Sequence, residues 1–300
     1  MNGFEFPKIS EHSATPVWIG PGSGFLVGDQ KMKILSYGDH ADIPGWSDAL
    51  SSFHESNAGD AHFIDRASRR HALEQIVKYY GDKNDCVIMD IGCSSGFMLR
   101  DLTERFPDSF VIGSDIVREP LENLAESRSD IPLMHFDLTT CPLNDNSVDV
   151  IILLNVLEHI EDDKLALWHV FRILKPGGIA IIEVPANPDL YDIYDKMLLH
   201  YRRYQLSSLD SMVCQLGFNV LNKSHLGFLI YLPFYLVKKR TQKAFSQSVD
   251  NLEANVAQNI KSTKDSRLLD LATRLELFIG KWFAYPTGIR CLLTIQKPEN

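Results

Sequence analysis

A regular alternation of short apolar runs and helical patterns between residues 86 and 184 most constrains the fold of this chain. The apolar runs are residues 86–89, 110–113, 133–136, 148–154 and 179–184. The run at 148–154 is apolar apart from Asp149, which is typical of a strand covered on both faces. Strands that alternate with helices predict an α/β fold with a mainly parallel sheet and helices on both of its faces.

The segments that flank this alternation are less regular. Residues 1–60 contain prolines, glycines and single aromatic residues without a sustained period, which predicts an extension of short strands and turns. Residues 226–285 have a mostly helical pattern with a polar middle. We therefore divide the chain into an N-terminal extension that is a candidate part of a substrate cover (1–60), a ligand-binding core (61–225), a helical insertion (226–285) and a final core strand (286–300).

A glycine-containing loop follows the first strand of the alternation. The strand ends in Asp90 and passes into Gly92-Cys93-Ser94-Ser95-Gly96. The two glycines remove side chains where the backbone must turn sharply and approach a ligand. The helix that follows presents free N–H groups and a partial positive charge, so a ligand carboxylate or phosphate can bind there. The alternative is a tight strand–helix turn that binds nothing.

Polar residues also follow the next three strands. Asp115 ends the second strand, Asp137 follows the third and Asn155 follows the fourth. Ligands of open α/β sheets bind at the edge formed by these strand ends. Asp115 is placed to accept hydrogen bonds from two ribose hydroxyls, and Asp137 from an adenine amine, while the Leu138 backbone reads the ring edge. A single aspartate here is more often a turn or cap residue, but their concurrence predicts a nucleoside site.

Four strings carry a resemblance to a known family: VIMDIGCSSGFML, VIGSDI, FDLTTCPLNDNSVDVIILLNVLEHI and RILKPGGIAIIEVP. They resemble the successive motifs of class I S-adenosylmethionine-dependent methyltransferases over about residues 76–218. The resemblance implies a Rossmann-like, doubly wound α/β fold. Its sheet is seven-stranded and mainly parallel with one antiparallel strand, and the N-terminal extension and the helical C-terminal insertion are added to it.

The resemblance also assigns the cofactor site. S-adenosylmethionine is the implied cofactor, with S-adenosylhomocysteine as product, and 61–225 is the core that binds it. Its methionine part lies along Asp90, Gly92 and Gly96, its ribose at Asp115, its adenine at Asp137 and Leu138, and its sulfonium near Asn155. The neighbouring residues Cys93, Ser94, Ile116 and Val156 complete the predicted cofactor-binding set. Ser94 is a departure, because many members have a middle glycine there.

Two other functions are weighed against methyl transfer. A nicotinamide dinucleotide site requires the pattern G-x-G-x-x-G, and here Ser94 and Phe97 replace the second and third glycines. The third hypothesis is a methyltransferase-like module that binds the cofactor, or a partner, without catalysis.

Candidate acceptor residues form two groups. His159, next to Glu158, is a candidate base, although the favoured interpretation is that it caps or packs beneath the cofactor loop. The second group is the string HYRRY at residues 200–204, and similar strings occur in bacterial relatives of the family. Within it, His200 can orient or deprotonate the acceptor, Arg203 can pair with an anionic group and Tyr204 completes the predicted catalytic set. The alternative is a solvated basic helix start.

Composition limits the partners. Thirty basic against 39 acidic side chains give a net charge of -9, which argues against nucleic acid. The expected acceptor is a small molecule, a glycan or a lipid.

The five cysteines include no CxxC pair, so no metal site is predicted. No signal-peptide pattern is seen, and a cytoplasmic location is expected. Residues 226–240 are apolar and then basic, which indicates either a core helix or peripheral membrane contact. The oligomeric state stays open.

Overall fold

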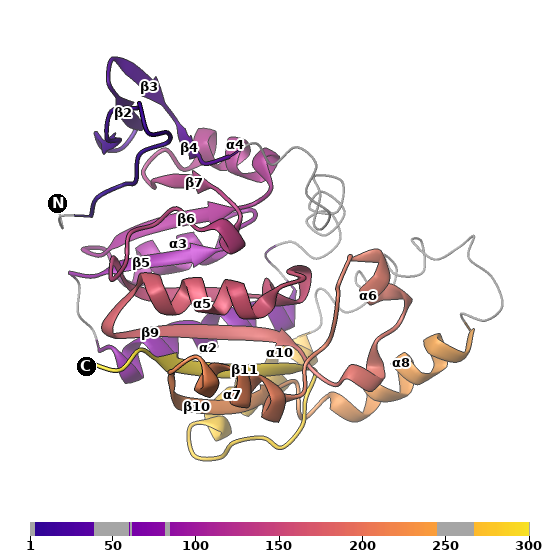
Figure 1. Ribbon diagram of the computed structural model, residues 1–300. Coiled ribbons are helices and arrows are strands. Elements are labelled where there is room, and N and C mark those ends of the chain that lie inside the picture. Colours follow the sequence, from indigo (N-terminus) through magenta and orange to yellow (C-terminus); the bar gives the residue numbers. More distant parts are fainter. Residues whose placement is uncertain (1–3, 39–59, 61, 82–84, 245–266, 300) are drawn as a thin grey trace.

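The computed structural model describes residues 4–38, 60, 62–81, 85–244 and 267–299. Figure 1 shows a central twisted sheet with helices on both faces. In the described residues this sheet has eight strands in the order β10-β11-β9-β8-β5-β6-β7-β4. The six strands from β4 to β9 pair in parallel, and β11 is antiparallel to both of its neighbours. The α/β fold with a mainly parallel sheet and one antiparallel strand is confirmed.

The strands of the large sheet are β4 (Ile34–Ser36), β5 (Val87–Ile91), β6 (Phe110–Asp115), β7 (Leu133–His135), β8 (Val148–Leu154), β9 (Leu174–Pro185), β10 (Asn219–Leu226) and β11 (Arg290–Gln296). The helices are α2 (Phe63–Tyr79), α3 (Phe97–Arg105), α4 (Arg118–Ser127), α5 (Asp163–Ile173), α6 (Ile193–Met197), α7 (Leu206–Gln215), α8 (Tyr231–Ala244) and α10 (Arg267–Gly280). Short helical turns follow three strands: η1 (Leu138–Thr140), η2 (Leu157–His159) and η3 (Pro188–Leu190).

The two faces of the sheet carry separate apolar cores. Alternate residues of β5 show this, because Met89 packs into one core and Ile88 into the other. The first core includes residues of α5, α7 and the N-terminal segment, and the second includes residues of α2, α3 and α4. Burial on both faces explains why these strands read as continuous apolar runs in the sequence.

Two features differ from the sequence-based expectation. The sheet has an eighth strand because β4, from the N-terminal segment, pairs in parallel with β7 and covers that edge. The remainder of this segment forms a small antiparallel sheet of β1 (Val17–Trp18), β2 (Phe25–Val27) and β3 (Gln30–Met32). The strand expected at 179–184 begins earlier, because β9 starts at Leu174 and has a register shift against β8.

The predicted insertion at 226–285 contains α8 and α10, and its middle, 245–266, lies outside the described residues. α10 is fixed to the start of this segment by Glu276, which is 1% exposed. Its carboxylate accepts hydrogen bonds from the backbone N–H groups of Gly227, Phe228 and Leu229. In the part of the chain that the structure describes, no helix is long and apolar enough to cross a membrane.

Candidate functional site

The glycine loop after β5 makes a tight turn that side chains would obstruct. Gly92 and Gly96 have φ of +78° and +74°. A Cβ atom on Gly92 would lie 2.5 Å from Val156 Cγ2, and one on Gly96 would lie 2.5 Å from Leu124 Cδ2. Ser94 also has a positive φ, of 42°, a backbone conformation that glycine adopts more readily than other residues. The backbone therefore keeps the loop conformation despite the serine.

Asp115 joins this loop to the end of β6. Its carboxylate accepts hydrogen bonds from the backbone N–H of Ser94 at 2.8 Å and of Val117 at 2.9 Å. The loop is held a second time by β6, because the N–H groups of Gly92 and Cys93 both donate to the Ser114 carbonyl. The structure thus brings the ends of β5 and β6 together around one carboxylate.

Asp90 is a buried carboxyl group with an unsatisfied oxygen. It is 3% exposed, and Oδ2 has no hydrogen-bond partner among the described residues. Burial, and then the negative charge of Asp115, raise the pKa of Asp90 to about 8. A ligand that brings a positive charge or an N–H donor next to Oδ2 would remove this penalty.

Residues after β6 and β7 form the next part of the same sheet edge. Asp137 caps η1, with Oδ1 accepting from the Thr139 N–H at 2.7 Å. Leu138 is buried beside it. A ring nitrogen of His135 lies 3.0 Å from the carbonyl oxygen of Ile116, which connects the two strand ends. Sequence reasoning missed His135, because it reads as one more residue of a buried strand.

Asn155 and Val156 follow β8 and lead to a second cluster. Asn155 adopts a positive φ of 56°, and its N–H donates to the Glu183 carbonyl at 2.9 Å. This turn places Val156 against Gly92 and begins η2, which carries Glu158 and His159. The cofactor loop and η2 are therefore in direct contact.

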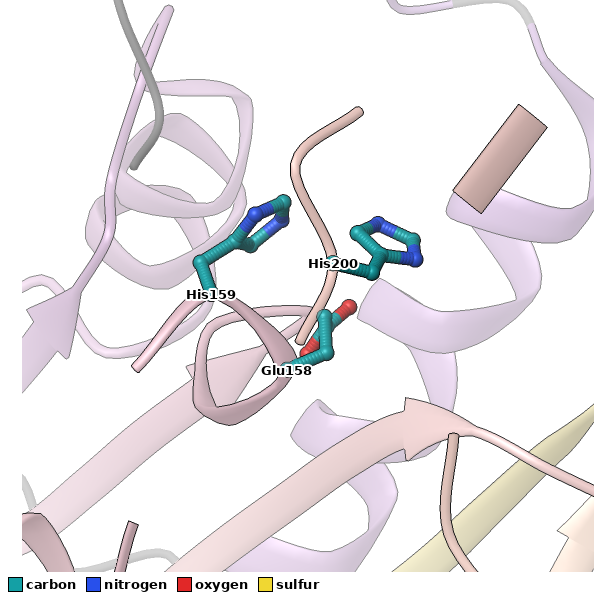
Figure 2. A group of neighbouring side chains, drawn as sticks. All are labelled: Glu158, His159 and His200. Atoms are coloured by element: carbon teal, nitrogen blue, oxygen red, sulfur yellow. The ribbon is translucent and has the colours of Figure 1, made fainter. Parts of the chain in front are cut away.

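Figure 2 shows Glu158, His159 and His200 around one small region, with the first two on η2 and the third after α6. The imidazole rings of His159 and His200 are 4.7 Å apart between centroids, in an edge-to-face arrangement. Glu158 is fully buried, and neither carboxylate oxygen has a hydrogen-bond partner among the described residues. Burial raises the pKa of Glu158 to about 8.

His200 is held from behind by Asp195, a fully buried residue of α6. Nδ1 of His200 lies 2.9 Å from Oδ1 of Asp195. Burial alone would raise the pKa of Asp195, but the hydrogen bond with His200 and the charges of Arg203 and Lys238 outweigh it and hold the pKa well below its usual range. An ionised Asp195 has no proton to donate, so Nδ1 carries the proton and the Nε2 lone pair of His200 remains.

Arg203 and Tyr204 have partners inside the protein. Arg203 Nε donates to Asp195 at 2.8 Å, and Nη1 donates to the Ala186 carbonyl. The Tyr204 hydroxyl lies 2.8 Å from Asp163 Oδ2 and 3.1 Å from the Leu157 carbonyl. Both side chains are buried and support η2 and the segment of His200. Tyr191 contributes to the same support by donating to the His200 carbonyl at 2.6 Å.

The carboxylates behind His200 were missed by the sequence analysis. Asp192 and Asp195 form a capping box at the start of α6, a local signal that the D-x-x-D spacing contains. Lys238 of α8 donates to Asp192 at 2.7 Å and to Asp195 at 3.3 Å. No sequence signal identifies that contact, because the residues are distant in the chain and only the packing of α8 against α6 joins them.

Comparisons with known proteins agree with this geometry. A family model described as "Methyltransferase domain" matches residues 89–182, from the middle of β5 into β9. A relative from Mycolicibacterium smegmatis, described as a "Probable S-adenosylmethionine-dependent methyltransferase", is 27% identical over 138 residues, which are 44% of this chain and 52% of that protein. The ubiquinone biosynthesis O-methyltransferase of Rickettsia bellii is 29% identical over 127 residues, 41% of this chain and 52% of that protein.

Residues 89–182 thus match a methyltransferase domain, and the chain is similar to S-adenosylmethionine-dependent methyltransferases. The chain spans about half the length of the curated relatives that it matches. Solved structures share its fold. The 1,6-didemethyltoxoflavin-N1-methyltransferase of Burkholderia thailandensis, solved with S-adenosylhomocysteine, has a TM-score of 0.51 at 14% identity, over 84% of this chain and 86% of that one. The [4+2]-cyclase SpnF has a TM-score of 0.54 at 15% identity, over 84% of this chain and 92% of that one.

The residues at the sheet edge fit the family's cofactor, S-adenosylmethionine. The unsatisfied Oδ2 of Asp90 suits an amino-acid ammonium group, and the loop from Gly92 to Gly96 has no room for side chains where a ligand would approach. Asp115 lies at the strand end where a ribose is bound in sheets of this kind. The matching family model and the relatives named above are described as methyltransferases, not as nicotinamide-dependent enzymes.

Proposed function

We propose that this methyltransferase transfers the methyl group of S-adenosylmethionine to an oxygen atom of a small-molecule, glycan or lipid-linked acceptor, which binds beside Glu158, His159 and His200. The observation that carries this proposal is the contact between the cofactor loop and η2. Gly92 meets Val156, which is two residues before Glu158. A methyl donor held by the loop would therefore lie close to this cluster of ionisable side chains.

His200 is the residue best placed to take a proton from the acceptor. Asp195 fixes the ring through Nδ1 and leaves the Nε2 lone pair available. S-adenosylmethionine supplies an electrophilic methyl carbon, whose bond to sulfur breaks as the bond to the acceptor oxygen forms. The protein's part is to hold the acceptor oxygen in line with that carbon, to receive its proton and to exclude water.

The acceptor class follows from charge and from the relatives. The net charge of -9 supports a small or uncharged acceptor over a nucleic acid. Two relatives are named as methyltransferases of oxygen: the ubiquinone biosynthesis enzyme of Rickettsia bellii and the malonyl-[acyl-carrier protein] O-methyltransferase 1 of Coxiella burnetii, which is 26% identical over 139 residues. Their names support oxygen as the attacked atom.

A turnover experiment tests the proposal, because a fold shared with a cyclase does not by itself require methyl transfer. We expect the protein, given S-adenosylmethionine with a labelled methyl group and a small-molecule extract of its own cells, to label a base-stable ether product. His200→Gln should lower the rate by about 100-fold, while the affinity for S-adenosylmethionine stays within about twofold. His12→Ala, at an exposed histidine, is the matched control. Tight cofactor binding without any labelled product would instead favour the non-catalytic module.

We also propose that the helices of the insertion rest on a membrane surface. On α8, Leu232, Leu236 and Val237 are 66%, 49% and 51% exposed. Large apolar side chains are exposed along α10 and directly after it as well: Leu268, Leu271, Leu275, Phe278, Trp282 and Phe283. Few soluble surfaces expose so many large apolar side chains on one helix. The exposed basic residue Arg240 ends the apolar stretch of α8 and suits anionic lipid headgroups. Arg274 and Lys281 are also exposed, and each is paired with one carboxylate of the protein.

A vesicle assay tests this surface. The protein should sediment with vesicles that contain anionic phospholipid, and Phe278→Ser combined with Trp282→Ser should reduce the bound fraction by about tenfold or more, because two large apolar groups no longer enter the bilayer. Leu165→Ser, at an exposed leucine of α5, is the control and should bind as the wild type does. If the wild type, the double variant and Leu165→Ser bound vesicles equally, this surface would not be the membrane-binding surface. If the wild type formed a dimer that dissociated in the double variant, the surface would instead be assigned to self-association.

A further inference from the structure

Glu158, His159 and His200 form an arrangement that the proposed methyl transfer does not fully explain. One candidate donor atom from each side chain lies within 4.8 Å of the other two. Figure 2 shows the carboxylate and the two imidazole rings facing a common region. A single general base requires one of these side chains. A general base alone does not explain why a buried carboxylate and two imidazoles lie within reach of one another.

The state of Glu158 is the first indication of a ligand. A fully buried carboxylate normally has hydrogen-bond donors on its oxygens, since an unpaired polar group inside a protein is costly. Glu158 has no such donor on either oxygen among the residues described. Among the described residues, the cations Arg290 and Arg203 act on this carboxylate through their charge alone, and its own backbone N–H is a nearby polar group. Its neighbours within the cluster are the two imidazoles. A bound cation would satisfy both oxygens.

The environment of His200 is the second and independent indication. Histidines that bind metals commonly donate their other ring nitrogen to a carboxylate, which fixes the ring orientation and the tautomer. Nδ1 of His200 makes this contact with Asp195 at 2.9 Å, and Asp195 is itself held by Arg203. Nε2 is then the nitrogen left to bind an ion.

We propose that Glu158, His159 and His200 bind one divalent transition-metal ion. Two imidazoles and one carboxylate are the donor set that suits Zn²⁺, Fe²⁺, Co²⁺ or Mn²⁺, whereas Mg²⁺ and Ca²⁺ prefer oxygen ligands throughout. Small side-chain rotations bring donor atoms at these separations to about 2.0–2.2 Å from a common ion. The sequence analysis predicted no metal site, because it searched for cysteine pairs, and because Glu158 and His159 lie 42 and 41 residues before His200.

Three protein ligands leave coordination positions open on the ion. An acceptor hydroxyl that binds there would become more acidic and lose its proton to water. The resulting alkoxide would form a bond to the methyl carbon as the bond from that carbon to sulfur breaks, which releases S-adenosylhomocysteine. This second step rests on the proposed function, and it requires an acceptor that carries a hydroxyl group. With the ion bound, His200 acts as a ligand and the ion takes over the activation of the hydroxyl.

Metal binding by the full-length protein, without S-adenosylmethionine, tests the site directly. Chelator-treated protein dialysed against Zn²⁺ should retain one ion per chain, and Co²⁺ should give a visible absorption band. Glu158→Gln and His200→Ala should each weaken binding by about 100-fold or more. Glu161→Gln, an exposed glutamate three residues from Glu158, is the matched control and should bind as the wild type does. Zn²⁺ should also raise the Tm of the wild type and not that of Glu158→Gln.

The proposal would be overturned if the wild type, Glu158→Gln and His200→Ala retained the same amount of Zn²⁺. It would also be overturned if the wild type retained none. The affinity of the same metal-free samples for S-adenosylmethionine separates the two proposals. If the protein binds S-adenosylmethionine and methylates but holds no metal, the metal site is refuted and the proposed function stands. If the protein holds Zn²⁺ at these residues but neither binds nor consumes S-adenosylmethionine, the proposed function is refuted and the metal site stands.

Discussion

An Asp115→Ala protein is expected to bind S-adenosylmethionine about 100-fold more weakly than the wild type, or worse. The substitution removes a charged acceptor from the strand end where we expect the ribose of S-adenosylmethionine to bind. Hydrogen bonds to a charged group contribute about 1.5–3 kcal/mol each, and two ribose hydroxyls are involved. The loop is weakened as well, because the N–H groups of Ser94 and Val117 both lose the carboxylate that accepts from them.

Titration calorimetry with S-adenosylmethionine measures this effect. Asp115→Asn separates the two contributions, because it keeps one acceptor oxygen for the loop and should lose less affinity than the alanine variant. Asp108→Ala, at an exposed aspartate between α3 and β6, is the control and should leave the affinity unchanged. Wild-type affinity in Asp115→Ala would contradict the assignment of the ribose to this residue.

Replacing Asp195 by alanine is expected to destabilise the protein by about 3–5 kcal/mol. Asp195 is fully buried and compensates two buried cations, Arg203 and Lys238. Its removal leaves Arg203 with one carbonyl partner and Lys238 with Asp192 as its remaining ion pair. A buried charge without its counterion costs more than the ion pair contributed. His200 also loses the group that fixes its ring.

Thermal unfolding followed by circular dichroism should show a Tm lower by roughly 5–15 °C for Asp195→Ala. Asp189→Ala, at an exposed aspartate in η3, is the control and should unfold as the wild type does. The double variant Asp195→Ala/Lys238→Met should recover part of the loss, because it removes one of the two unpaired cations. A Tm unchanged by Asp195→Ala would mean that this carboxylate does not hold the segment of His200 in place.

The strand pattern and the cofactor loop were accessible from local sequence. The runs at 110–113 and 148–154 became β6 and β8, because a strand buried on both faces must be apolar along its whole length. The loop from Gly92 to Gly96 was recognisable since its glycines adopt a backbone conformation that other residues rarely take. Asp115 and Asp137 followed from the rule that parallel strands end at one edge of a sheet.

Arg203 illustrates what local sequence could not decide. A basic residue in the HYRRY string is equally compatible with a solvated helix start and with a site for an anionic acceptor. The structure places its guanidinium on Asp195, which is 0% exposed, so its charge is balanced inside the protein. β4 is a similar case, because three residues of an irregular extension become a strand only where β7 offers an unpaired edge.

The sequence by itself therefore determined the α/β fold and the glycine loop, and it predicted the resemblance to methyltransferases and the nucleoside end of a cofactor site. These depend on apolar periodicity and on residues within a few positions of a strand end. Only the tertiary structure decided which side chains meet behind and beside the acceptor. Glu158, His159 and His200 come together because η2 and the segment after α6 pack on each other, and Lys238 reaches Asp195 only through the packing of α8. Contacts of this kind depend on burial and charge balance between distant segments, which leave no period in the chain.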